Sequence, residues 1–228
     1  MPVLPGSPPV EITLRRSARA RRFSLRVSRL DGRVTLSLPL RARESEAMDF
    51  ARTQEGWIRD TLARMPQQAG VALGSAVPVE GRMLVLAPIS GRGVRIEGDS
   101  LLVAGDPAQA GARVAAFLKA LARERLVAAS DRYAAQIGRR VTQVSLRDTR
   151  SRWGSCAHDG KLMYSWRLVM APPSVLDYVA AHEVAHMEQM NHSPAYWAVV
   201  DRLYPGWQAQ RKWLHTHGQA LHSYRFGD

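Results

Sequence analysis

The chain has 228 residues, 46% of them hydrophobic, which is typical of a globular protein with one or two domains. It holds no apolar run of the roughly 18 residues that a transmembrane helix needs, and its start lacks the basic and apolar segments of a signal peptide. One cysteine, Cys156, excludes an intrachain disulfide and fits a reducing compartment. We therefore expect a cytoplasmic protein that does not enter a membrane; its oligomeric state is left open.

The formal net charge is +12, and only three of the 32 Lys and Arg residues are lysines. An excess of arginine is typical of a protein that binds a polyanion such as nucleic acid, or an acidic partner. A solvated surface rich in basic residues would give the same net charge without any such partner. The densest basic segment is residues 15–33. If nucleic acid is bound, the contacts expected from this segment are Arg15, Arg16, Arg19, Arg21 and Arg22.

Residues 12–105 predict a β-rich region with one helix, after a disordered N-terminus of residues 1–11. Apolar residues alternate over 23–27 and again over 34–38, and Asp31-Gly32 between them favours a β-hairpin with an arginine-rich outer face. Residues 44–65 predict a helix, ended by Pro66, whose inner side carries Met48, Ala51, Trp57, Ile58 and Leu62. Short strands are expected over 82–86, 94–97 and 101–103, separated by glycines.

Residues 106–228 predict a second domain of mixed composition. Asp106-Pro107 is a typical N-cap and first residue of a long helix, for which Gly138 is a suitable end. Strands are expected over 141–147 and 162–168, the second after an Asp159-Gly160 turn. The whole chain is therefore assigned to the α+β class.

The most informative motif is His182-Glu183-Val184-Ala185-His186, with His192 six residues later. Two histidines four apart on a helix share a face, so both can bind one metal, and the HExxH pattern is a zinc metallopeptidase signature. Apolar spacing predicts a helix from about residue 174 to 190, with Ser174 as N-cap and Asp177 in a variant capping box.

His192 would leave the ligand face of a straight helix, so the sequence predicts a break before it. Asn191 is the expected breaking residue because asparagine tolerates left-handed dihedral angles, and Ser193-Pro194 is typical of a new helix start. The histidine spacing equals that of metzincins, HExxHxxGxxH, but Gln189 stands where their glycine stands. This difference favours another kind of zincin.

Several ordered motifs together resemble the YgjP-like metallopeptidases, relatives of the SprT-like zinc proteases. They are RSRWGSC at residues 150–156, YSWRL at 164–168, Pro172, DYV at 177–179, the HExxH motif and NHS at 191–193, with Met187 where leucine is usual. The resemblance covers roughly residues 12–222. It implies a zincin-like domain, here residues 106–228, with a small mixed sheet and an active-site helix. It also implies Zn²⁺ held by His182, His186 and His192, with Glu183 catalytic.

The expected reaction is peptide-bond hydrolysis of a protein or peptide substrate. Three imidazoles leave one position on zinc for water, and Glu183 would act as general base toward it. Residues 162–166 are a candidate edge strand for a bound peptide, with an ordinary buried strand as the alternative. The candidate contacts to the substrate or the oxyanion are Arg152, Tyr164 and Trp166. Alternatively, Arg152 forms a structural ion pair with Asp148 or Asp159.

Two other functions remain as alternatives. The arginine excess motivates a metal-dependent nucleotide phosphohydrolase, but the chain has no Walker-type loop and no carboxylate-rich magnesium site. The arginine-rich hairpin motivates a nucleic-acid-associated protease or binding module. Cys156 could act as a fourth zinc ligand, or serve as a small buried apolar residue, which is the commoner role of a lone cysteine.

Overall fold

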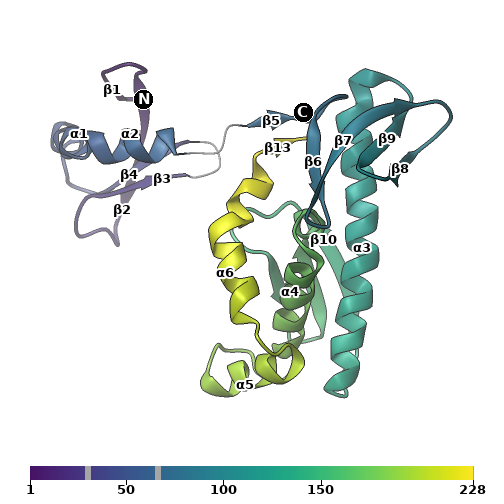
Figure 1. Cartoon of the computed structure of the whole chain (residues 1–228). Coiled ribbons are helices and arrows are strands. Elements are labelled where there is room, and N and C mark those ends of the chain that lie inside the picture. The colour runs from purple at the N-terminus through teal and green to yellow at the C-terminus, as the bar shows by residue number, and fades with distance from the viewer. Residues whose placement is uncertain (29–31, 65–67, 228) are drawn as a thin grey trace. The chain divides into compact units, whose positions relative to one another are not determined.

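The computed structural model describes residues 1–28, 32–64 and 68–227, and it divides into two compact units, residues 1–67 and 68–228 (Figure 1). The α+β class is confirmed, but the boundary is not the one expected between residues 105 and 106. The strands that follow residue 71 share one hydrophobic core with the long helix α3, Ala110–Gln136. Leu86 and Leu101 of these strands are buried in the same cluster as Val114, so the strands cannot belong to a separate domain.

The first unit contains a four-stranded sheet in the order β1-β2-β4-β3. Its strands are β1 (Val3–Leu4), β2 (Val10–Ser17), β3 (Ser24–Val27) and β4 (Val34–Pro39). The predicted hairpin is confirmed, since β3 pairs antiparallel with β4, while Asp31 of its turn lies outside the described residues. The predicted disorder of residues 1–11 is wrong, because Leu4 and Val10 are buried and β1 pairs with β2.

Two helices cover the inner face of this sheet where the sequence predicted one. Helix α1 (Glu44–Thr53) and helix α2 (Glu55–Ala63) meet at Gln54, whose backbone leaves the helical region. Met48, Ala51 and Ile58 are buried as expected, but Trp57 is 47% exposed. Because of the break at Gln54, the side chains of α2 do not continue the periodicity of α1. Trp57 was predicted on the inner side from the periodicity of a single helix, and that prediction is wrong. Met65 and Pro66 lie outside the described residues.

The second unit begins with a four-stranded sheet in the order β6-β7-β9-β8, followed by α3. Its strands are β6 (Ala76–Val79), β7 (Arg82–Ile89), β8 (Val94–Glu97) and β9 (Ser100–Ala104), which confirms the three predicted runs. Asp106 caps as predicted by accepting a hydrogen bond from the Ala108 amide at 2.9 Å, and a 3₁₀ turn (Pro107–Gln109) precedes α3. The short β5 (Ala69–Gly70) pairs with β13 (Tyr224–Arg225) near the C-terminus.

A three-stranded sheet lies beside the predicted metal site. Its order is β10-β12-β11, from β10 (Gln143–Arg147), β12 (Lys161–Ser165) and β11 (Gly154–Cys156). Of the two alternatives for residues 162–166, the structure has the buried strand and not the edge strand, because β12 is hydrogen-bonded on both sides. The strand also ends at Ser165, and a 3₁₀ helix (Trp166–Met170) follows. Within the described residues β11 pairs with β12 alone and is therefore an edge.

Three helices complete this unit: α4 (Pro173–Ala185), α5 (Pro194–Leu203) and α6 (Gln208–His217), with a final 3₁₀ helix (Gly218–His222). Pro172, not Ser174, is the N-cap of α4. Asp177 does not close a capping box, because Arg132 of α3 donates to both its carboxylate oxygens at 2.7 and 2.8 Å. In the part of the chain that the structure describes, no helix is both long and apolar enough to cross a membrane.

Candidate metal centre

The HExxH motif lies at the C-terminal end of α4, which is shorter than predicted. The helix ends at Ala185 and His186 is its C-cap, so the break comes five residues earlier than Asn191. A tight turn follows, in which the Glu188 and Gln189 amides both donate to the Ala185 carbonyl at 3.1 Å. The His186 ring helps to hold this turn, since its Nδ1 lies 3.1 Å from the Gln189 carbonyl oxygen. A carbonyl only accepts, so Nδ1 carries the proton and Nε2 keeps its lone pair.

The chain from 189 to 194 returns His192 to the same place. Asn191 takes part without a left-handed backbone, which corrects the prediction: in the described residues Glu80 is the one non-glycine with positive φ. Instead the Asn191 side chain accepts a hydrogen bond from the Ser193 amide at 3.3 Å. Ser193 then caps α5 as predicted, accepting from the Tyr196 amide at 3.3 Å, with Pro194 as first residue. Two successive side-chain caps thus fix the path on either side of His192.

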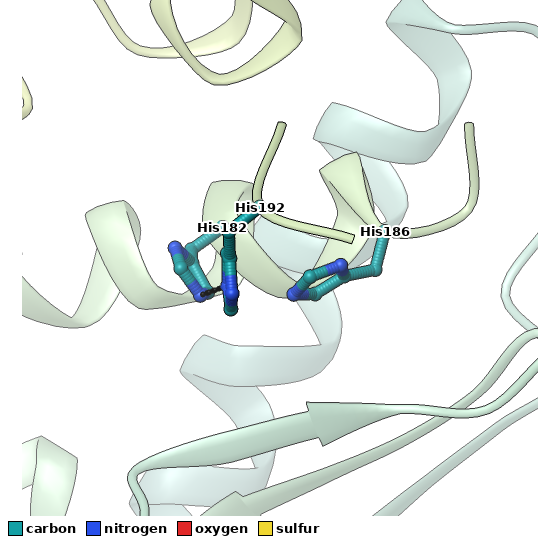
Figure 2. A group of neighbouring side chains, drawn as sticks. All are labelled: His182, His186 and His192. Atoms are coloured by element: carbon teal, nitrogen blue, oxygen red, sulfur yellow. Dashed lines mark hydrogen bonds between the residues drawn. The ribbon is translucent and has the colours of Figure 1, made fainter. Parts of the chain in front are cut away.

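The three imidazoles converge, as Figure 2 shows, with the rings of His182 and His192 side by side and that of His186 directed at them. One ligand atom from each lies within 4.8 Å of the others. The Nε2 atoms of His182 and His192 are 3.4 Å apart. Two nitrogens held about 2.0–2.1 Å from a tetrahedral ion would lie roughly 3.4 Å apart, so this pair fits zinc. Within the described residues these three histidines are the group that could hold a metal.

Tyr196 of α5 packs at the centre of this group, and the sequence analysis passed over it. It is fully buried, and its ring stacks on His186 with centroids 4.4 Å apart and meets His192 edge-on at 4.8 Å. Its hydroxyl donates to the His182 carbonyl at 2.9 Å. That carbonyl lies in the last turn of α4, where the helix itself supplies no partner. An aromatic residue in the first turn of the helix that follows His192 was the available signal.

A second aromatic layer supports His192. Trp197 stacks on His192 at 5.7 Å and on Trp207 at 4.3 Å, and the Arg211 guanidinium lies 5.1 Å from the Trp197 ring centre. Stacking restricts the ring orientation of a histidine that comes from a loop, and so it favours a preformed ligand set.

The surroundings of His182 and His186 favour neutral imidazoles, which metal binding requires. Burial lowers the pKa of His182 to about 3, and repulsion from His186, His192 and Arg211 acts in the same direction. Burial also lowers the pKa of His186. The Nδ1 atom of His182 is buried and has no hydrogen-bond partner in the described residues.

Glu183 is 5% exposed and faces the edge strand β11. A Cβ atom added at Gly154 would lie 2.5 Å from its Oε1, so the carboxylate occupies the space that a side chain at residue 154 would fill. Burial raises the pKa of Glu183 to about 8, and the charge of Arg152 opposes that rise. The carboxylate is therefore held between the metal-site helix and the sheet edge in an environment that favours proton uptake.

The three candidate contacts to substrate are placed differently from one another. Arg152 is exposed and lies near enough to Glu183 to affect its pKa, whereas Asp148 and Asp159 pair with Arg167 and Lys161. Its alternative ion pairs therefore do not form. Tyr164 is fully buried with its hydroxyl 2.9 Å from Ser130 Oγ. Trp166 is 3% exposed and packs edge-on against Phe226. Tyr164 is therefore enclosed in the core, whereas Trp166 lines a cavity together with Lys119 and Asp148.

Cys156 lies on β11, and its thiol donates to the neighbouring Ala157 carbonyl at 3.4 Å. Burial and the nearby charge of Glu183 raise the pKa of its thiol to about 11, which disfavours a thiolate ligand. Two carboxylates near the ligand histidines in the sequence are engaged elsewhere, since Asp177 pairs with Arg132 and Glu188 with Arg202. The five arginines expected at nucleic acid, Arg15, Arg16, Arg19, Arg21 and Arg22, belong to the first unit.

A comparison with known protein families shows to which family the chain belongs. The family model described as "YgjP-like, metallopeptidase domain" matches residues 21–217. The chain belongs to this family. The match includes β3 and β4 of the first unit and the histidine cluster of the second, whereas β1 and β2 precede the matched residues.

No curated protein matches this YgjP-like chain. Among solved structures, the crystal structure of the metallopeptidase zymogen of Pyrococcus abyssi abylysin overlaps 41% of this chain and 93% of that chain. The two share 17% sequence identity, and the TM-score is 0.36. An overlap at this score is too loose to specify a shared fold.

Proposed function

We propose that this metallopeptidase uses zinc, held by His182, His186 and His192, and that Glu183 is the general base. The observation that carries the proposal is the convergence of three imidazoles beside one buried carboxylate. The all-imidazole ligand set argues against hard ions such as Mg²⁺ and Ca²⁺, which prefer oxygen ligands, and the 3.4 Å between the Nε2 atoms of His182 and His192 is compatible with tetrahedral zinc.

When bound, zinc supplies Lewis acidity that polarises a water molecule and the carbonyl of the scissile bond. Glu183 accepts a proton from the attacking water and then delivers it to the leaving amine nitrogen. The raised pKa of Glu183, about 8, suits both transfers, because a base that must also act as an acid works best with a pKa near the working pH. Arg152 is the charged residue that opposes this rise, so it adjusts the proton affinity of Glu183.

The edge strand β11 is the proposed docking edge for the substrate backbone. Its outer side has no strand partner in the described residues, and Gly154 on it lies against the Glu183 carboxylate. An extended peptide that adds to this edge would place its backbone next to the general base. This role passes to β11 from residues 162–166, because residues 162–165 belong to the central strand β12.

The proposal is tested by purifying the wild-type chain and Glu183→Gln and measuring bound zinc and hydrolysis of a dye-labelled unfolded protein. We expect about one zinc per chain in both proteins. Cleavage by the variant should fall by a factor of at least about 100, because an amide cannot accept the proton. Equal cleavage by the two proteins would overturn the role of Glu183.

The same preparations are given a panel of nucleoside triphosphates, each with and without a chelator. Chelator-sensitive release of phosphate together with no cleavage of unfolded protein would replace the peptidase by the phosphohydrolase alternative. In the described residues, no phosphate-binding loop lies beside the three histidines, so we expect the nucleotides to remain intact.

A further inference from the structure

The sheet of the first unit has one face that its helices do not cover. In the register of β2, β4 and β3, Ile12 lies beside Val34, and Leu14 beside Leu36 and Leu25. These apolar residues pack with α1 and α2 in one cluster, whose helical members are Ala47, Met48, Ala51 and Ile58. Because side chains alternate along a strand, the residues between them point to the other side. We call that side the open face.

The open face carries hydroxyl groups and arginines. Thr13 pairs with Thr35, Arg15 with Ser37, Ser24 with Ser37 and Arg26 with Thr35, so these side chains share one surface. Arg15 and Arg26 are exposed, and they stand on the two strands that flank β4. Two strand spacings separate them by roughly 10 Å across the sheet. Ser and Thr hydroxyls lie between the two guanidinium groups.

The loop from β2 to β3 extends this basic surface beyond the sheet. Arg19, Arg21 and Arg22 lie in it, and all three are exposed. In the part of the chain that the structure describes, none of Arg15, Arg19, Arg21, Arg22 and Arg26 forms an ion pair with a carboxylate. Residues 12–28 contain no acidic residue, and among the described strand residues the one acidic side chain on the open face is Glu11, at the start of β2 beside β1. Arginines without carboxylate partners leave their donors available to an anionic ligand.

Arg16 differs from these residues. It points to the inner side, beside Leu38, and donates to the backbone carbonyls of Leu40 and Ala42, each at 2.8 Å. Its guanidinium thus stabilises the end of β4. Arg16 therefore does not belong to the surface that the sequence analysis assigned to five arginines, and Arg26 takes its place.

We propose that the open face and the β2–β3 loop bind the phosphate backbone of a nucleic-acid duplex. Arginine guanidinium groups and Ser or Thr hydroxyls are the side chains that contact phosphate oxygens. The face offers no ring on which an unpaired base could stack: Phe23 stacks on Phe50 at 5.7 Å, and Trp57 belongs to α2. A single strand would need such stacking, so the chemistry fits a duplex, bound without regard to sequence.

The test uses the full chain and a fluorescein-labelled 20-base-pair DNA duplex, with fluorescence anisotropy measured from low to high salt. We expect affinity to fall steeply with salt. In Arg15→Gln/Arg26→Gln the affinity should fall about tenfold or more at low salt, and the slope of log K against log salt should shrink by about 2. Arg19→Gln/Arg22→Gln, which leaves the strands unchanged, should act in the same way.

The matched control is Arg52→Gln/Arg64→Gln, which removes the same charge from the helices α1 and α2. Its affinity should stay within about twofold of wild type. Binding should also survive Glu183→Gln and a chelator, so this proposal can fail or succeed independently of the peptidase. Absent binding, equal weakening by control and open-face variants, or stronger binding to polyglutamate or anionic phospholipid vesicles than to the duplex would overturn it.

Discussion

The two units differ in whether charged and polar side chains are buried or exposed. In the described part of the first unit every buried residue is apolar, and its arginines lie at the surface. The second unit buries Glu183 and Arg167 together with Ser130 and Ser165. A buried charge costs free energy and persists where packing and partners hold it, so it indicates a group with a specific task. The two proposals follow this contrast, since they put bond cleavage in the second unit and electrostatic binding in the first.

The largest expected effect on stability comes from Arg167→Ala. Arg167 is 8% exposed, pairs with Asp148 at 2.7 and 3.0 Å, and donates to the carbonyls of Leu221 and Tyr224. Its removal leaves these groups without a partner, and we expect a loss of about 3–5 kcal/mol in the free energy of unfolding, measured by denaturant titration. Arg26→Ala in the first unit should cost less than about 0.5 kcal/mol. Equal losses would contradict the contrast between the units.

Gly154→Ala tests the position of the buried carboxylate. The added Cβ would come within 2.5 Å of Glu183 Oε1, so the carboxylate must move away from β11. We expect hydrolysis to fall by a factor of about 100 while bound zinc is retained. Gly70→Ala is the matched control, because no atom lies within 4 Å of its added Cβ. If both variants keep full activity, Glu183 does not need its place against β11.

Tyr196→Phe should have a smaller effect. It removes the hydrogen bond to the His182 carbonyl but keeps the ring that stacks on His186. We expect a loss of about 1 kcal/mol in thermal stability with zinc still bound. Tyr204→Phe is a suitable control, since its hydroxyl makes no hydrogen bond in the described residues. A variant with unchanged melting temperature would show that the hydroxyl does not stabilise the end of α4.

The smallest expected effect is a pH dependence from Asp148. Burial pushes its pKa upward, but the hydrogen bonds and charge of Arg167 outweigh it, and the pKa lies below its ordinary value. Such a carboxyl stabilises the fold above its unfolded pKa of about 4, and the stabilisation is lost as pH falls through the lower folded value.

The side chain of Asp148 is 46% exposed, so solvent screening limits this effect to less than about 1 kcal/mol. The free energy of unfolding should fall more between pH 6 and pH 3 in wild type than in Asp148→Asn. An identical pH profile for the two proteins would show that Asp148 does not contribute to the pH dependence of stability.

Local signals predicted much of the fold. The caps at Asp106 and Ser193, the hairpin of β3 and β4, and the strands β7 to β9 depend on neighbouring residues, and the structure has them. Long-range pairing was not predictable in the same way. The parallel pairing of β2 with β4, the central place of β12 and the shared core of residues 71–136 depend on partners far along the chain.

The candidate site shows the same division. Helical spacing and the Ser193-Pro194 cap predicted that His182, His186 and His192 could meet, and the structure brings them together. Tyr164 fitted the pattern of a substrate contact, but its depth in the core follows from packing against α3, which no local pattern reveals. The turn at Asn191 depends on its side chain and not on its backbone dihedral angles, because the carboxamide oxygen accepts a hydrogen bond from the Ser193 amide.

The most direct test of the central claim is the zinc content of three proteins measured by elemental analysis: wild type, His192→Ala and His158→Ala. His158 is exposed and lies outside the histidine cluster, so it controls for the loss of one imidazole. We predict about one zinc per chain in wild type and His158→Ala, with loss of zinc and of protein cleavage in His192→Ala. Full zinc occupancy in His192→Ala, or wild type unable to bind zinc, would contradict the account.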